Sequence, residues 1–366
     1  MCGGEGPARA PPLDFPGANR KLAPLEVPGR MTSTAASWMM PGLPLLFALG
    51  VLFGFEVLAR FVVPMMGHGA VAWKTKKERA VPVQSSHHDA LDGRDWLCIT
   101  FSRLITIPFA YHLVVFCCAS DSVVWPSGAH GSAAAFPADL PSALFTTDGF
   151  AHANDAVVSF LGERAFVAAN ATSIAPGASV EAPKPALATI AHHALAIALL
   201  YVTYDFFYYW LHRTLHLRSL YKYCHKHHHR QHAPTRGNLD AINVHPFEFI
   251  CGEYNHLLAV FLVGNALRAV GLGGVPVGAV LFFIVVGGAL ASLNHTRFNV
   301  RFGALAPFYA FDRAKEGATP AYEVAAHDVH HRLPTKNYGQ YLMCWDMMFG
   351  SHERLVDKTA SRAKAQ

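Results

Sequence analysis

Hydrophobic residues in this chain form long, nearly uninterrupted runs separated by polar or glycine- and proline-rich segments. Three runs, at 41–63, 96–119 and 188–210, have the length of a membrane-spanning helix. Two more, at 249–267 and 275–293, are separated by the short segment RAVGLGG, which predicts a helical hairpin. A helix needs about 20 apolar residues to cross a bilayer. The pattern therefore predicts an all-α fold, a polytopic membrane helical bundle.

The segments outside these runs predict the domain organisation. Residues 1–40 are rich in glycine, proline and alanine without a period, which is typical of a disordered N-terminal tail. We expect N-terminal transmembrane helices and a basic loop over 41–119, and a low-complexity loop over 120–187. The chemistry is expected in a domain at 188–352, followed by a C-terminal tail at 353–366.

Composition supports a membrane protein and argues against two other classes. Hydrophobic residues make up 52% of the chain and charged residues only 15%, whereas an ordinary soluble domain has about 25% charged residues. The net charge of +5 comes from scattered basic residues rather than a basic stripe, which excludes a nucleic-acid-binding protein. The seven cysteines show no paired spacing, so we expect reduced thiols rather than a disulfide framework.

The orientation in the membrane follows from the basic residues of the loops. Arg164 and Lys184 are the only two in the long loop after the second run, whereas the shorter loop before it has five. Cytosolic loops carry the excess of Lys and Arg, so the shorter loop is expected in the cytosol and the long loop in the lumen. The segment after the third run is then cytosolic. The five residues are Lys74, Lys76, Lys77, Arg79 and Arg94.

Histidines are concentrated in the segments that this orientation places in the cytosol. Thirteen of the 22 histidines lie between residues 212 and 331, in the spacings H-x3-H, H-x2-HH and again H-x2-HH. Residues three and four apart share a helix face, so each segment offers a column of imidazoles. Eight imidazoles exceed the four ligands of one zinc ion, which predicts a cytosolic helical cap holding two adjacent metal ions. The eight are His212, His216, His225, His228, His229, His327, His330 and His331.

Other polar residues near the histidines are assigned by position. On a helical wheel His227 points away from His225, so we expect it to be solvated. His232 continues the stripe of the second segment and is either a ligand or a neighbour of one. Histidine ligands usually donate their second N–H to a carboxylate or carbonyl group, and Asp205 and Asp328 are the expected carboxylates. Glu248, Glu323 and Asp346 are further candidates.

The series DFFYYWLHRTLH, HKHHH, NVHPFE, NHTRFNV, HDVHH and NYGQYLMCWDMMFGS resembles the fatty acid hydroxylase/sterol desaturase superfamily of membrane non-haem di-iron enzymes. The resemblance covers residues 188–352. It implies two iron ions held by the eight histidines, with His295 as a ninth ligand and His245 as a neighbouring residue. It also implies O2 as cosubstrate, a separate cytochrome b5-like electron donor, and hydroxylation or desaturation of a sterol or fatty acyl lipid in lipid biosynthesis.

Two alternatives remain from the sequence, a catalytically inactive lipid-binding relative and a histidine-based metal transporter. A transporter is expected to carry ionisable residues in the middle of several spans, whereas the histidine segments follow the ends of the hydrophobic runs. The chain ends in SRAKAQ, and Arg362 and Lys364 resemble a retrieval signal for the endoplasmic reticulum. We therefore expect the endoplasmic reticulum membrane, with a plastid membrane as the alternative.

Overall fold

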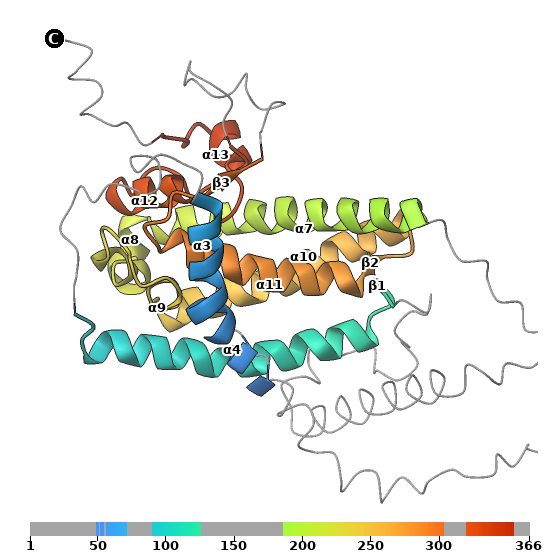
Figure 1. Ribbon diagram of the computed structural model, residues 1–366, viewed down its shortest axis with the longest axis horizontal. Helices are drawn as coiled ribbons and strands as arrows, with labels where there is room; N and C mark the ends of the chain where they lie inside the picture. Colours follow the sequence, from blue (N-terminus) through green and yellow to red (C-terminus); the bar gives the residue numbers. More distant parts are fainter. Residues whose placement is uncertain are drawn as a thin grey trace, which may run out of the picture. The chain divides into compact units, whose positions relative to one another are not determined.

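The computed structural model describes residues 49–50, 52–54, 56–71, 90–125, 186–303 and 320–354 (Figure 1). The predicted N-terminal tail and most of the basic and lumenal loops lie outside these residues, as do Arg362 and Lys364 of the C-terminal tail. The orientation in the membrane and the retrieval signal therefore stay predictions.

Four long helices dominate the described part of the chain. They are α4 (Gly93–Ala119), α7 (Ala186–Leu215), α10 (Pro246–Ala269) and α11 (Val277–Asn294). Both α10 and α11 pack along α7, and α10 also packs along α4, so that α7, α10 and α11 lie side by side (Figure 1). The predicted helical hairpin is therefore present, but its two helices pack mainly on α7.

Helix α4 begins at a capping box. The side chain of Asp92 accepts hydrogen bonds from the backbone N–H groups of Arg94 and Asp95, at 2.9 and 3.0 Å. In return the Asp95 carboxylate accepts from the Asp92 backbone N–H at 2.8 Å. Reciprocal capping satisfies N–H groups that the first turn of a helix leaves without partners. It fixes the start of α4, and Asp95 on this turn reaches the histidine segments described below.

The core between the long helices is built from aliphatic and aromatic side chains. Leu200 and Tyr204 on α7, Val260 on α10 and Val280 and Phe283 on α11 are buried in one hydrophobic cluster. Because lipid tails are as apolar as these side chains, close van der Waals packing rather than removal from water holds membrane helices together here. Helix α3 (Val63–Val71), preceded by the π-helical turn η1 (Leu58–Val62), packs against α11.

One end of the bundle is closed by a parallel pair of short strands, β1 (Val123–Val124) and β2 (Val275–Pro276). The turn before β2 passes so near Ser122 that a Cβ atom at Gly274 would lie 2.3 Å from the Ser122 carbonyl oxygen. Gly274 also has a φ of +132°, which side-chain-bearing residues rarely adopt. Glycine is therefore required in this turn.

The histidine-bearing segments lie at the other end, around the carboxyl end of α7 (Figure 1). They comprise short helical pieces and one antiparallel strand pair, β3 with β4. In chain order these are α8 (Arg218–Leu220), η4 (Tyr221–His225), η5 (His228–Arg230), α9 (Asn238–Ala241), β3 (Arg301–Phe302), β4 (Tyr322–Glu323), α12 (Val324–Arg332) and α13 (Cys344–Met348).

The structure confirms a helical membrane protein. Within the described residues, three helical stretches are long and apolar enough to cross a membrane: Gly93–Cys117, Leu187–Leu215 and Val277–Asn294. The predicted span at 249–267 lies inside α10 but is not among them, because its middle carries the polar sequence EYNH. The predicted run 41–63 is described only in part.

Candidate metal centre

Five histidines from all three histidine segments converge at the end of α7, and we name them cluster A. The Nε2 atom of His225 lies 3.0 Å from Nε2 of His212 and 3.0 Å from Nε2 of His229. Nε2 of His330, on α12, lies 3.1 Å from that of His229 and 3.2 Å from that of His216. Each of the five offers one nitrogen, and these nitrogens lie within 4.8 Å of one another.

Four further histidines form a second group, cluster B. His295 follows the last residue of α11, and its Nε2 lies 3.4 Å from Nε2 of His228 and 3.1 Å from Nε2 of His327. His331 completes the group, with its Nε2 3.1 Å from that of His327. All four side chains are buried. Clusters A and B together contain the nine histidines that the spacing and the resemblance single out, so the fold brings all of them together.

Burial keeps these imidazoles neutral. Desolvation, reinforced by the neighbouring histidines, holds the pKa of His225, His228, His327, His330 and His331 well below the usual 6.5. Desolvation likewise lowers the pKa of His229 to about 3. A neutral imidazole has one nitrogen with a free lone pair, and that nitrogen is the metal ligand.

Hydrogen bonds on the outer side of the rings decide which nitrogen has the lone pair. Nδ1 of His212 lies 2.8 Å from the carbonyl oxygen of Tyr338, and Nδ1 of His330 lies 2.6 Å from that of Lys336. A carbonyl oxygen can only accept, so both Nδ1 atoms donate and each Nε2 is left unprotonated. In cluster B, Nδ1 of His295 donates to its own helix, 2.8 Å from the Ala291 carbonyl oxygen.

Glu248 lies beside the outer nitrogen of His225. Its Oε2 atom is 2.8 Å from Nδ1 of His225 but outside hydrogen-bond geometry, and an ionised carboxylate at that distance favours a proton on Nδ1. His212 and His225 then turn two lone pairs toward each other across 3.0 Å, an arrangement that is repulsive without a shared cation. Metal–imidazole bonds of about 2.1 Å at a right angle would separate two ligand nitrogens by about 3.0 Å. The donor set therefore fits a metal ion.

The expected partner Asp205 acts through a loop and not on a histidine. Its carboxylate accepts backbone N–H groups of Gln340 at 3.0 Å and Tyr341 at 3.1 Å, and also that of Leu342. This loop also carries the Tyr338 carbonyl group that accepts from His212. Asp205 therefore fixes the backbone that orients a cluster A histidine, which corrects the expectation of a direct contact.

The other expected neighbours of the ligands also lie elsewhere. Asp328 pairs with the guanidinium groups of Arg297 and Arg332 rather than with a histidine. His245 caps the amino end of α10, where its Nδ1 accepts the Phe247 backbone N–H at 3.2 Å. His232 is exposed and belongs to neither cluster. The assignment of these three beside the metal ligands receives no support from the geometry.

The prediction that His227 is solvated is wrong. His227 is buried; its Nε2 lies 2.8 Å from Oδ1 of Asn243 and 3.2 Å from Oδ1 of Asp95. The segment is a π-helical turn followed by a 3-10 turn, η4 and η5, so the helical wheel used for the prediction does not apply. His227 instead ties the second histidine segment to the first turn of α4.

Several partners of the histidines could not be read from the sequence. Glu248 was one candidate carboxylate among five, and only the packing of α10 against η4 selects it. The carbonyl groups of Tyr338 and Lys336 carry no sequence signal, because every residue has one. Their role follows from the loop geometry alone.

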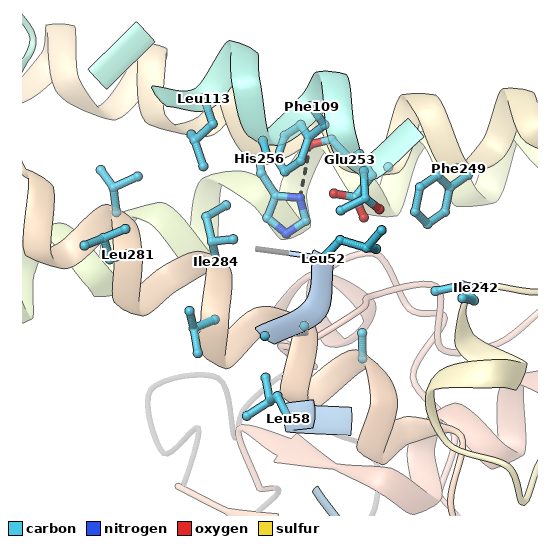
Figure 2. Close-up of a pocket in the computed structure, with 18 of the residues that line it drawn as sticks. Leu52, Leu58, Phe109, Leu113, Ile242, Phe249, Glu253, His256, Leu281 and Ile284 are labelled. Atoms are coloured by element: carbon cyan, nitrogen blue, oxygen red, sulfur yellow. Dashed lines mark hydrogen bonds between the residues drawn. The ribbon is translucent and has the colours of Figure 1, made fainter. Parts of the chain in front are cut away.

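An apolar cavity of about 730 Å³ adjoins the clusters. It is lined by α4, α10, α11 and residues of the 52–58 segment, with Phe109, Leu113, Leu281 and Ile284 among its walls (Figure 2). Its polar residues include Glu248, which contacts His225, and Tyr208, whose ring centroid lies 5.3 Å from that of His212. The cavity therefore runs from the membrane helices to the edge of cluster A.

Comparison with known proteins identifies the same part of the chain as the histidine clusters do. Residues 197–351 match the family model of fatty acid hydroxylase. The chain is 30% identical over 163 residues to a Delta(7)-sterol 5(6)-desaturase of Aspergillus fumigatus, covering 42% of this chain and 48% of that protein. It is 29% identical over 193 residues to a putative methylsterol monooxygenase of Dictyostelium discoideum, covering 51% and 63%.

A CER1-like protein of Arabidopsis thaliana is 28% identical over 172 residues, which cover 46% of this chain and 25% of that protein. The chain thus matches a quarter to under two thirds of the length of these relatives. No solved structure matches it. The family match covers the segments that supply all nine clustered histidines. Residues 197–351 thus match the fatty acid hydroxylase family, and the chain is similar to relatives named as sterol desaturases and methylsterol monooxygenases.

Proposed function

We propose that this protein is a membrane-bound non-haem di-iron oxidoreductase that uses O2 and externally supplied electrons to hydroxylate or desaturate a lipid. One observation carries the proposal. Within each of two groups of neutral imidazoles the ligand nitrogens lie within 4.8 Å of one another, and the groups adjoin an apolar cavity among membrane-spanning helices. The relatives named as sterol desaturases and methylsterol monooxygenases support the reaction class.

Each cluster would hold one iron ion. Imidazole nitrogen suits iron, and a six-coordinate ion held by five or by four histidines would keep one or two positions open. A bound iron pair supplies the activation of O2 and the oxidising power to break an unactivated C–H bond. The ligands would be His212, His216, His225, His229 and His330 for the first ion, and His228, His295, His327 and His331 for the second.

The protein contributes orientation and exclusion of water. The carbonyl groups of Tyr338 and Lys336 keep the protons of His212 and His330 on Nδ1, so that each Nε2 stays a donor toward the metal. Glu248 does the same for His225. The apolar walls of the cavity bind the hydrocarbon part of the lipid and hold it against the edge of cluster A.

The remaining parts of the proposal concern the protein's surroundings. We propose that electrons come from a separate cytochrome b5-like protein, because the family resemblance implies such a donor. Lipid biosynthesis in the endoplasmic reticulum membrane is the proposed setting, with a plastid membrane as the alternative. In either membrane the histidine clusters would face the donor from the cytosolic or stromal side.

An isotope experiment tests the reaction. The iron-loaded protein in lipid nanodiscs is supplied with a reductant, a total lipid extract and ¹⁸O2, and products are analysed by mass spectrometry. Hydroxylation predicts a lipid heavier by one ¹⁸O atom, and desaturation predicts one lighter by two hydrogen atoms. Both products should be absent with His330→Ala. Iron-replete wild-type protein that yields neither product would favour the inactive lipid-binding relative, and transport of metal into sealed vesicles would favour the transporter.

A further inference from the structure

Three carboxyl groups line the wall of the cavity, and only two of them have a partner in the described part of the chain. Glu56 accepts from Arg103, whose Nε atom lies 2.7 Å from Oε1. Glu248 contacts Nδ1 of His225 at 2.8 Å. The carboxyl group of Glu253 makes neither a hydrogen bond nor an ion pair with any described residue, although its residue lines the same cavity.

The neighbours of Glu253 do not supply a partner. Figure 2 shows Glu253 between His256 and Phe249 on α10, with Leu52 and Phe109 among the apolar side chains around the cavity. Both ring nitrogens of His256 are engaged: Nδ1 donates to the Glu253 carbonyl oxygen at 3.2 Å, and Nε2 lies 3.4 Å from the Tyr341 hydroxyl. The Glu253 carboxyl group therefore lines a mainly apolar cavity without a hydrogen-bond donor from the described residues.

Such a carboxyl group needs a partner from elsewhere. A polar group in apolar surroundings is unfavourable unless it forms a hydrogen bond, and a carboxylate more so than a neutral group. A carboxyl group with no structural partner is also an expensive residue to keep in a membrane protein. Its position on the cavity wall makes a ligand that enters the cavity the natural donor.

The helix geometry determines where along the cavity a ligand group bound to Glu253 would lie. Glu253 lies five residues after Glu248 on α10, and a rise of 1.5 Å per residue separates them by about 7.5 Å along the helix axis. Glu248 marks the end of the cavity next to cluster A, since it contacts His225. A ligand group bound to Glu253 therefore fixes how far the rest of the molecule extends toward the histidines.

We propose that Glu253 determines substrate specificity by accepting a hydrogen bond from a hydroxyl group of the lipid. The inference rests on the proposed function and names the substrate class of the same site: a lipid alcohol, including a sterol, rather than a free fatty acid. An oxygen of the carboxyl group accepts an O–H group well, and the apolar walls around Glu253 disfavour a charged head group, whether the carboxylate of a free fatty acid or an ammonium group.

Ligand binding tests this inference without turnover. Two sets of probes bind to the iron-loaded full chain in detergent in the absence of reductant: 5α-cholestan-3β-ol with 5α-cholestane, and 1-octadecanol with octadecane, octadecanoic acid and octadecylamine. The alcohol of the skeleton that fits should bind about tenfold more tightly than its hydrocarbon. No preference for either alcohol would overturn the inference, as would tighter binding of octadecanoic acid or octadecylamine than of 1-octadecanol.

Variants of Glu253 separate the hydrogen bond from general effects. Glu253→Leu should abolish the preference for the alcohol and raise the thermal unfolding temperature, because the unpaired carboxyl group is gone. Glu253→Gln retains an accepting oxygen and should keep part of the preference, which covers the case in which the leucine variant does not fold. The control Glu353→Gln changes a side chain that is 41% exposed and lies outside the cavity lining, and it should keep the full preference.

An alcohol preference unchanged in both Glu253 variants would overturn the assignment. Failure of the role given to Glu253 can be distinguished from failure of the proposed function. A protein that discriminates alcohols through Glu253 but yields no oxidised lipid would contradict the oxidoreductase and leave the binding role of Glu253 intact. A protein that oxidises lipids without a role for Glu253 would do the reverse.

Discussion

Oε2 of Glu248 on α10 lies 2.8 Å from Nδ1 of His225, the histidine that contacts two others in cluster A. The same glutamate lines the apolar cavity. One side chain thus joins the wall against which a lipid would lie to the imidazole that would bind metal. With Glu248 ionised, the contact favours the tautomer of His225 that has its proton on Nδ1 and leaves Nε2 free.

Glu248→Gln should weaken metal binding at cluster A. The amide is a poorer acceptor and can also donate to Nδ1, which would move the proton to Nε2 and block the ligand. Loss of such an outer partner typically lowers metal affinity by about 10- to 100-fold. Competition with a chelator measures the effect, and Glu253→Gln is the matched control with the affinity of wild type. Equal affinity in all three proteins would contradict the role given to Glu248.

Asp205→Asn should loosen the loop that follows α12. In the asparagine an NH2 group replaces one of the two oxygens that accept the backbone N–H groups of Gln340, Tyr341 and Leu342. A buried N–H group left without an acceptor costs about 1–3 kcal/mol, so the thermal unfolding temperature should fall. Hydrogen exchange at these three amides should accelerate most. Exchange that accelerates evenly over the whole chain would point to a general loss of stability instead.

His227→Ala and His232→Ala separate a buried structural histidine from an exposed one. His227 bonds Asn243 and contacts Asp95, so its removal should cost about 1–3 kcal/mol of unfolding free energy while metal content at saturation stays that of wild type. His232→Ala should change neither quantity. Loss of a metal ion in His227→Ala would show that the residue is a ligand after all.

The metal-free protein should lose stability as the pH falls below about 6.5. The pKa values of five cluster histidines lie well below this value in the folded state because of burial. In the unfolded state they bind protons from about 6.5 downward, so the unfolded state binds more protons and the unfolding free energy decreases with falling pH. Thermal unfolding with chelator at pH 7.5 and 5.5 measures this, and equal or greater stability at pH 5.5 would contradict it.

The sequence predicted the histidines better than their surroundings. Spacing alone singled out eight of the nine, because residues three and four apart stay neighbours in almost any helical turn. It failed at His227, because the wheel argument needs a regular α-helix and the segment forms a π turn and a 3-10 turn. Hydropathy predicted all four long helices, and α10 among them also carries polar residues that line the cavity.

The partners of the histidines were least predictable. Asp205 and Asp328 were expected beside a ligand from their distance along the sequence, yet both serve other groups. Contacts between distant segments decide such roles, as with Glu248 and His225, which are 23 positions apart in the chain. A single sequence shows which residues have suitable chemistry, and the packing of helices selects among them.

Metal analysis of the purified full chain tests the central claim most directly. Iron content and competing metals are measured for wild type, His330→Ala from cluster A, His331→Ala from cluster B, and the control His232→Ala. Two independent clusters predict about two iron ions per chain in wild type and in the control, and about one in each cluster variant. Less than one ion per chain in wild type, or an unchanged content in both cluster variants, would contradict a di-iron site built from these histidines.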